Sequence, residues 1–308
     1  MTRISMTKCL SLFIALFLSA CSFSTLDVYT PETDHFFRAV NVENKQYDVV
    51  FVLGGGGVKG IAHLGVLEEL ELAGIHPDLI VGCSAGAIVG ALYAHYPSTK
   101  HLEKILLDTT SEDFIEDNYW PHSRFAVKDG ERFKSYLQRN LRGATFDDLS
   151  IPLVVVATDL GDGKLIELHE GDLASAVQAS GSVLGVFEPV QIFGKYFVDG
   201  GAVDNIPVQT AKKFNPKIII AVDISEGLSK EGPTNLLGIL KRAIEISYRH
   251  QIKDSVTQAD VAIAMNFQDI GLFDEPKKQE MYETGRQKAR EAIPGIKRLM
   301  KKRLGRVL

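Results

Sequence analysis

Residues 48–70 read DVVFVLGGGGVKGIAHLGVLEEL, a short apolar run followed by four glycines and then by a helical pattern. An all-apolar run of this length is typical of a strand in a parallel sheet that is covered on both faces. From Ile61 onward the apolar positions recur at helical spacing, and the pattern ends near Gly74. A strand, a tight loop and a helix in this order predict a βα unit, which favours an α/β fold.

The same alternation continues along the chain. Apolar runs predict strands at residues 79–81, 151–158, 195–198 and 218–222, and helical patterns cover residues 87–95, 236–257 and 277–302. Residues 98–147 are charged and helical in pattern, and we expect them to form an insertion above the sheet. Alternating elements with short connections predict an α/β fold with a mostly parallel central sheet.

The composition is that of an ordinary globular protein. Of the 308 residues, 45% are hydrophobic and 24% are charged, which excludes a disordered chain, a collagen and a coiled coil as the overall class. The formal net charge of −5 gives no sign of a nucleic-acid partner. Three cysteines are too few for a disulfide scaffold, and no histidine pair has the spacing of a zinc site, so we expect no metal.

The N-terminus has the pattern of a secretory signal. Arg3 and Lys8 precede an apolar run at residues 9–18 that is too short to span a bilayer comfortably, and small residues follow it. This pattern predicts a signal peptide at residues 1–20, with an uncleaved anchor helix as the alternative. Residues 21–46 are polar and show no periodicity, so we expect them to form a tether.

The residues LSAC at positions 18–21 resemble the lipobox of bacterial lipoproteins. The resemblance implies that the signal is cut before Cys21, which then carries lipid and holds the chain at a membrane. Ser22 follows, rather than Asp, which by the same resemblance favours the outer membrane on its periplasmic side. We therefore expect a lipid-anchored protein of the bacterial cell envelope.

Residues 82–86, GCSAG, match the pattern G-x-S-x-G between a predicted strand and a predicted helix. A nucleophile at such a turn needs strained backbone angles, and Gly82 and Gly86 let the turn close without clashes. The helix that begins behind Ser84 directs free N–H groups toward developing negative charge. The pattern and its context predict Ser84 as a nucleophile.

The glycine loop at residues 54–60 has two functional interpretations. Backbone N–H groups that converge without side chains form either a phosphate cradle or an oxyanion hole. The spacing of Gly55, Gly57 and Gly60 matches a dinucleotide fingerprint, but the second strand lacks the acidic residue that holds the ribose. The P-loop pattern fails as well, because Gly60 follows Lys59 where Ser or Thr is required. A loop beside a nucleophile favours the oxyanion hole.

The third pattern is DGG at residues 199–201, at the end of a short predicted strand. By itself this is a common turn. Together with residues 55–60 and 82–86, however, it resembles the three signature blocks of the patatin-like phospholipase family, in order, within a region from Tyr47 to Ile296. The resemblance implies a three-layer α/β fold and hydrolysis of fatty-acyl esters of membrane lipids by a Ser84–Asp199 dyad, without a cofactor or metal.

The resemblance also assigns the supporting residues. It implies an oxyanion hole formed by the backbone N–H groups of Gly55, Gly56 and Gly57. The remaining motif positions are Lys59, Gly60, Gly82, Gly86, Gly200 and Gly201. The chain departs from bacterial relatives at Leu184 and Glu188, where proline is common, and this departure bears on acyl-chain preference.

Three alternatives remain open. One is a nucleotide-binding envelope lipoprotein that uses the glycine loop, and another is a catalytically idle lipoprotein with the same fold. A hydrolase triad would instead need a histidine after the acid, either His169 or His250. The sequence does not determine the oligomeric state.

No linker divides the chain after the tether, so we expect one catalytic domain at residues 47–294 and a basic tail at residues 295–308. From Lys277 onward there are eleven Lys and Arg residues against three Glu residues. A tail of this charge could hold the active-site face near anionic lipid, and a solvated helix face is the alternative.

Overall fold

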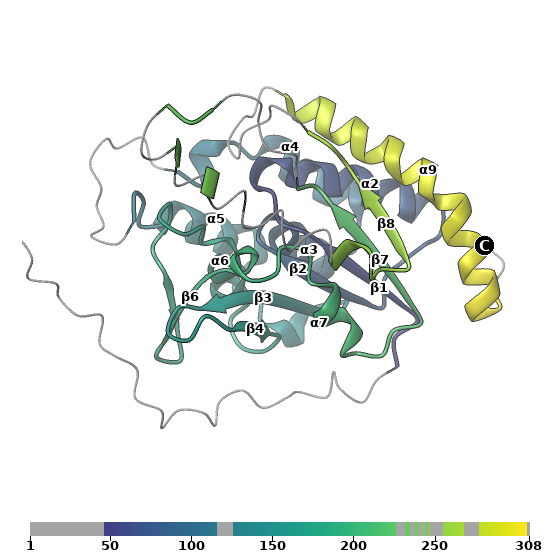
Figure 1. Ribbon diagram of the computed structural model, residues 1–308, viewed down its shortest axis with the longest axis horizontal. Helices are drawn as coiled ribbons and strands as arrows, with labels where there is room; N and C mark the ends of the chain where they lie inside the picture. The colour runs from purple at the N-terminus through teal and green to yellow at the C-terminus, as the bar shows by residue number, and fades with distance from the viewer. Residues whose placement is uncertain are drawn as a thin grey trace, which may run out of the picture. The chain divides into compact units, whose positions relative to one another are not determined.

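The computed structural model describes residues 46–115, 126–225, 255–267 and 277–306, and residues 232–234, 238–239, 242–243 and 246 between them (Figure 1). The predicted signal peptide, Cys21 and the tether up to residue 45 lie outside the described residues, as do His250 and most of the helix predicted at residues 236–257. None of the described helices is both long and apolar enough to cross a membrane.

The centre of the domain is one sheet in the strand order β5-β6-β3-β2-β1-β7-β8, with β4 paired to β3. The strands are β1 (Val49–Leu53), β2 (Leu79–Cys83), β3 (Leu153–Asp159), β4 (Leu165–Leu168), β5 (Val190–Ile192), β6 (Lys195–Asp199), β7 (Ile218–Asp223) and β8 (Val261–Ala264). Strands β3, β2, β1, β7 and β8 run parallel, whereas β4, β5 and β6 pair antiparallel at the other edge.

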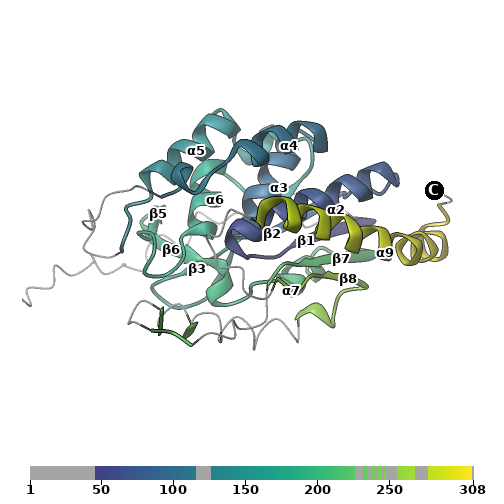
Figure 2. The same cartoon turned by 90° about the horizontal axis from the view of Figure 1, so that it is seen from above.

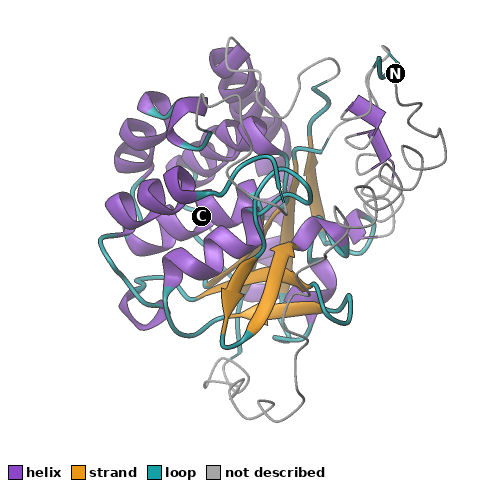
Figure 3. Ribbon diagram, turned by 90° about the vertical axis from the view of Figure 1, so that its left-hand side faces the viewer, coloured by secondary structure: helices purple, strands orange, loops and turns teal. Residues whose placement is uncertain are grey.

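The sheet is covered on both faces, as the all-apolar strands predict. In β1, Val49, Phe51 and Leu53 pack into the larger core, while Val50 and Val52 face the smaller one. Figures 2 and 3 show most helices gathered over the first face, and Figure 2 shows α7 on the second. The helices are α2 (Ile61–Leu72), α3 (Ala85–His95), α4 (Thr99–Asp108), α5 (Glu131–Leu141), α6 (Leu173–Gly181), α7 (Val208–Lys212) and α9 (Lys278–Leu304).

Helix α9 does not separate a tail from the domain. It continues through Pro294, and Ile296 and Met300 beyond this position are buried, so the boundary predicted at residue 294 is wrong. Its first half crosses α2 at two glycines, since a Cβ on Gly65 or Gly285 would lie 2.2 Å from a backbone oxygen of the other helix. The apolar residues at helical spacing make this segment part of the fold.

Candidate active site

The loop between β2 and α3 is a sharp turn with Ser84 at its apex. Ser84 has φ 51° and ψ −120°, a combination that costs backbone strain in any residue with a side chain. The elements beside it approach closely because two glycines flank the turn. A Cβ on Gly82 would lie 2.7 Å from the Cα of Ala87, and one on Gly86 would lie 2.0 Å from the carbonyl oxygen of Leu53. The backbone thus has the strain that G-x-S-x-G predicts.

Asp199 reaches Ser84 from the antiparallel side of the sheet. The register pairs Cys83 with Val156, and it pairs the next residue, Ala157, with Asp199. Asp199 therefore lies at the level of Ser84, although its strand runs in the opposite direction. The hydroxyl of Ser84 donates a hydrogen bond of 2.7 Å to Oδ2 of Asp199. The Ser84 hydroxyl and the Asp199 carboxylate are thus in direct contact, with no histidine between them.

The environment of Asp199 makes it a stronger base than an ordinary aspartate. The side chain is buried, and this burial raises its pKa to about 6, although hydrogen bonds from Ser84 and from the N–H of Gly201 oppose the shift. A carboxylate with this pKa is mostly ionised at neutral pH and accepts a proton more readily than an exposed one. Burial also raises the pKa of the adjacent Cys83 thiol, so that this group stays protonated and is no competing nucleophile.

The first part of the glycine loop is tied to its neighbours. The N–H of Gly54 donates to the carbonyl of Val222, and the N–H of Gly55 donates to the carbonyl of Asn205, each over 3.1 Å. Because its donor is occupied, Gly55 is excluded from the three oxyanion donors expected from the sequence.

Gly56 and Gly57 remain as candidate donors. Their N–H groups have no acceptor among the residues that the structure describes. Gly57 begins the 3₁₀ helix Gly57–Gly60 (η2) and lines a cavity together with Ser84. An oxyanion hole needs free donors of this kind close to the reacting serine.

Ser180 holds the backbone of Ser84, a contact that the motifs do not reveal. Its hydroxyl accepts the N–H of Ser84 over 2.8 Å and donates to the carbonyl of Val156 over 2.7 Å. Thr158 acts similarly on the other partner, since its hydroxyl donates to the carbonyl of Asp199 over 3.0 Å. These bonds fix both members of the pair to β3 and its neighbours. Only the fold shows what Ser180 contacts.

His63 supports the glycine loop from below. Its Nε2 lies 2.8 Å from the carbonyl oxygen of Gly54, so this nitrogen carries the proton and donates. Burial lowers the pKa of His63 to about 4, which keeps the ring neutral. The side chain is fully buried, so it packs in the core as well as making this polar contact.

Asn205 joins both backbone groups of Gly55. Its carbonyl accepts the Gly55 N–H, and its Nδ2 donates to the Gly55 carbonyl over 3.2 Å, while its buried Oδ1 has no hydrogen-bond partner in the described part of the chain. The side chain therefore fixes the loop just before the two free donors. It is buried, with 2% of its surface exposed.

This contact gives a first prediction. Asn205→Ala removes one hydrogen bond to the loop and should lower kcat for a soluble ester by about tenfold, since misplaced oxyanion donors cost rate. Asn205→Asp has nearly the same size but brings a carboxylate next to the developing oxyanion, so its loss should be larger above neutral pH. Steady-state kinetics of both variants measure this order. A reversed order, with Asn205→Ala the slower enzyme throughout, would contradict the role given to the loop.

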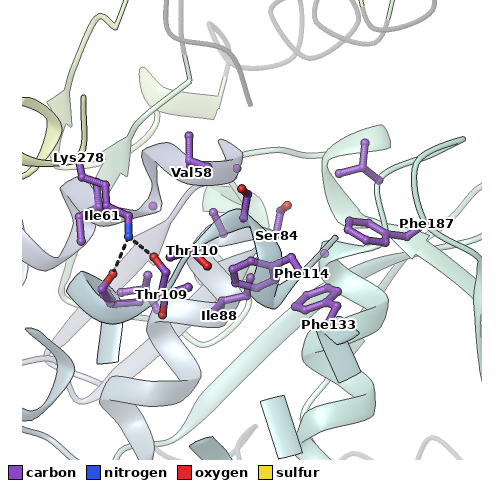
Figure 4. A pocket seen from close by; sticks show the side chains of 18 residues that line it. Val58, Ile61, Ser84, Ile88, Thr109, Thr110, Phe114, Phe133, Phe187 and Lys278 are labelled. Carbon is purple, nitrogen blue, oxygen red and sulfur yellow. Dashed lines mark hydrogen bonds between the residues drawn. The ribbon is translucent and has the colours of Figure 1, made fainter. Parts of the chain in front are cut away.

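Ser84 opens into an apolar cavity of about 130 Å³. Figure 4 shows the rings of Phe114, Phe133 and Phe187 on one side of Ser84, and Ile61 on the other. The lining comes mainly from η2, from α3, from the residues that follow α4 and from the segment after α6. Apolar walls with one polar group at the reacting position suit a fatty-acyl chain.

Lys278 stands at the rim of this cavity, but its charge is engaged by the protein. Its ammonium group donates to the carbonyls of Leu106 (3.5 Å), Leu107 (3.3 Å) and Thr109, at the C-terminal end of α4. A cation is favoured at that end of a helix. Lys278 thus ties the start of α9 to one wall of the cavity.

The other candidate residues have structural surroundings. Lys59 is buried. Burial raises the pKa of Asp223, and the positive charge of Lys59 opposes this rise, so Lys59 interacts favourably with the Asp223 carboxylate beside the loop. Leu184 and Glu188 each follow a residue that lines the cavity. His169 lines a separate cavity with Glu170, and no histidine in the described ranges hydrogen-bonds to the Ser84 hydroxyl. These described residues include no cluster of His, Cys and carboxylates that could hold a metal ion.

Comparison with known proteins identifies the family to which this chain is similar. The family model for patatin-like phospholipase matches residues 51–212, just over half of the chain. Patatin-like phospholipase domain-containing protein 6 of Mus musculus is 31% identical over 184 residues, which are 57% of this chain and 13% of that protein. Lysophospholipase NTE1 of Saccharomyces cerevisiae is 32% identical over 205 residues, 64% of this chain and 12% of that protein. The chain thus spans about an eighth of the length of these relatives.

Among solved structures, VipD from Legionella pneumophila superposes with a TM-score of 0.56 at 16% sequence identity, over 82% of this chain and 67% of that one. At this identity the likeness concerns the fold, and it confirms the α/β architecture with a central, mostly parallel sheet flanked by helices.

Proposed function

The chain belongs to the patatin-like phospholipase family, and from this premise we propose that it is a serine acyl hydrolase acting on fatty-acyl esters of membrane lipids. The observation that carries the proposal is the hydrogen bond of 2.7 Å between Ser84 and the buried carboxylate of Asp199, at the base of an apolar cavity. Family membership supports a carboxylic ester hydrolase, and the geometry supports the roles of the individual residues.

In the proposed mechanism, Oγ of Ser84 attacks the ester carbonyl while Asp199 takes its proton. The N–H groups of Gly56 and Gly57 stabilise the oxyanion that forms. When the intermediate collapses, the ester C–O bond breaks and the leaving alcohol receives the proton from Asp199. A water molecule then attacks the acyl-enzyme, again with Asp199 as the base. The bond between the acyl carbon and Oγ of Ser84 breaks, Oγ takes the proton back from Asp199, and the fatty acid leaves.

The alternative of a phosphate cradle has little support in the loop itself. Two of its N–H groups, those of Gly54 and Gly55, already donate to backbone carbonyls. The cavity beside the remaining donors is apolar, and the ammonium group of Lys278 at its rim is engaged by α4. A phosphate would find few charged partners there.

Release of fatty acid tests the proposed function. We expect wild type to release fatty acid from lysophosphatidylcholine or diacyl phosphatidylcholine, and Ser84→Ala to release none above the uncatalysed background. Mass spectrometry of the products identifies the bond that is cleaved. Equal release by both proteins would overturn the proposal, and thermal stabilisation by nucleotides without hydrolysis would favour the alternative instead.

We further propose that lipid on Cys21 anchors the protein in the bacterial cell envelope, at the periplasmic side of the outer membrane. The sequence pattern at residues 18–21 supports this placement. Stable anchoring needs at least two lipid chains, so wild type should stay with membranes in a salt wash and incorporate labelled palmitate. Cys21→Ala should do neither by this route. Release of wild type by salt alone would refute the anchor.

A further inference from the structure

The C-terminal end of α9 concentrates positive charge. After Glu291 the chain contains six Lys and Arg residues and no Asp or Glu. Two of the six are paired with acids of the domain, Arg303 with Asp260 over 2.6 Å and Arg306 with Asp48 over 2.7 Å. Asp260 and Asp48 are therefore already paired with cations of this helix end.

The other four basic residues form what we call the cation cluster: Lys297, Arg298, Lys301 and Lys302. Each is exposed or half-exposed, and none pairs with an acid in the part of the chain that the structure describes. Their spacing places them as neighbours on one face of α9, because residues four apart lie on successive turns. Like charges at this spacing destabilise a helix, so the cluster costs the isolated domain stability.

The helix dipole accounts for only part of this arrangement. Cations are stabilised at the C-terminal end of a helix, but the effect falls off within the last turn. Lys301 and Lys302 lie in that turn, whereas Lys297 and Arg298 lie one turn earlier, with Leu304 as the last helical residue. Repulsion that the fold leaves uncompensated indicates an anionic partner.

The cluster lies far from the cavity. Lys278, at the start of α9, lines the cavity, and a helix rises about 1.5 Å per residue, so the cluster is roughly 30–35 Å away along the helix axis (Figure 1). Arg306 pairs with Asp48, which immediately precedes β1. This contact lies at the N-terminal ends of the parallel strands, whereas Ser84 lies at their C-terminal ends. One of the two sequence-based alternatives placed this charge beside the active-site face, whereas the structure places it at the other end of the domain.

We propose that the cation cluster docks the domain on anionic lipid headgroups, with the mouth of the active-site cavity directed away from that bilayer. Gln46 is the first described residue, and it lies two positions before Asp48. A chain anchored at Cys21 would therefore join the domain at the end that carries the cation cluster. The choice of lipid over another polyanion rests on the proposed anchor and on the overall charge of −5, which disfavours a nucleic acid. In this orientation the cavity receives single lipid molecules from the aqueous side.

Hydrogen exchange on vesicles tests the docking. The full-length chain is reconstituted with phosphatidylcholine alone or with phosphatidylcholine and phosphatidylglycerol, and exchange is followed in peptides covering residues 294–306. On the anionic vesicles we expect exchange there to slow by about tenfold relative to neutral vesicles. The variant with Lys297, Arg298, Lys301 and Lys302 all changed to Gln should lose this protection but keep hydrolysis of a soluble ester. A control with Lys100, Lys104, Lys134 and Arg142 changed to Gln removes the same charge elsewhere and should keep the protection.

The outcomes separate the docking from the other proposals. If the protein floats with both kinds of vesicle but hydrogen exchange at residues 294–306 is not slowed, the docking is overturned and the anchor stands. Flotation with anionic vesicles only would support docking without an anchor, and flotation with neither would refute both. Stronger protection by heparin or RNA than by anionic vesicles would identify a different polyanion and overturn the choice of lipid. Ester hydrolysis, measured in parallel, reports on the proposed function alone.

Discussion

Asp199→Asn is expected to lower kcat/KM for a soluble nitrophenyl ester by about 10²–10⁴-fold, the usual contribution of a general base. The amide has the size of the carboxylate, but it cannot take the proton of Ser84. Ser84→Ala should cause at least as large a loss. Because the two groups act as one unit, the double variant should be little worse than either single variant. Full additivity of the two losses would contradict a dyad.

The stability of Asp199→Asn shows whether this loss reflects chemistry or unfolding. Burial raises the native pKa of Asp199 to about 6, so the native state holds a proton that the unfolded state has lost. The free energy of unfolding of wild type therefore falls as pH rises from about 4 to about 6, by roughly 3 kcal/mol from this one group. The asparagine variant has no such penalty. Urea unfolding should show that the free energy of unfolding of Asp199→Asn rises relative to that of wild type between about pH 4 and about pH 6. If the variant is inactive and also less stable than wild type at pH 7, the base role of Asp199 is contradicted.

Gly86→Ala is expected to cost more than about 4 kcal/mol of stability, or to prevent folding. The added Cβ would lie 2.0 Å from the carbonyl oxygen of Leu53 and 2.8 Å from that of Gly54. Both are backbone atoms at the end of β1, so no side chain can rotate to make room. Helix α3 would have to move away from the sheet, and the turn at Ser84 would open.

A second glycine provides the matched control. Gly295 lies within α9, and the nearest atom to an added Cβ is the end of the Arg298 side chain at 3.9 Å. Gly295→Ala should therefore stabilise the protein by about 0.5–1 kcal/mol through helix propensity. Denaturant unfolding of both variants measures the contrast. If Gly86→Ala unfolds at the same denaturant concentration as wild type, the close approach of α3 to β1 is wrong.

The parts of the fold that could be predicted were those with a strong local pattern. Strands β1, β2, β3 and β7 are apolar and buried on both faces, and the structure confirms all four within two residues. Three short strands were missed. Val190–Ile192 and Leu165–Leu168 are partly exposed and lie at the antiparallel edge, and Val261–Ala264 has only four residues. Their pairing depends on tertiary contacts more than on sequence pattern.

The site was predictable as far as motifs identify single residues. Ser84 and Asp199 were paired in advance only by resemblance, because they are 115 positions apart and meet through the antiparallel register of β6. No local pattern shows that the N–H of Gly55 is occupied by Asn205, or that Ser180 holds the N–H of Ser84. Such hydrogen bonds join distant segments, and only the packed structure reveals them.

Labelling with a fluorophosphonate tests the Ser84–Asp199 dyad, because the reagent reacts with a serine only when that serine is activated. The account predicts one adduct on Ser84, identified by peptide mass spectrometry, at a rate that rises with pH around a midpoint of about 6 and falls by orders of magnitude in Asp199→Asn. His169→Ala and His250→Ala should react within about tenfold of wild type. No adduct on Ser84, or full reactivity in Asp199→Asn together with a dead histidine variant, would contradict the Ser84–Asp199 dyad.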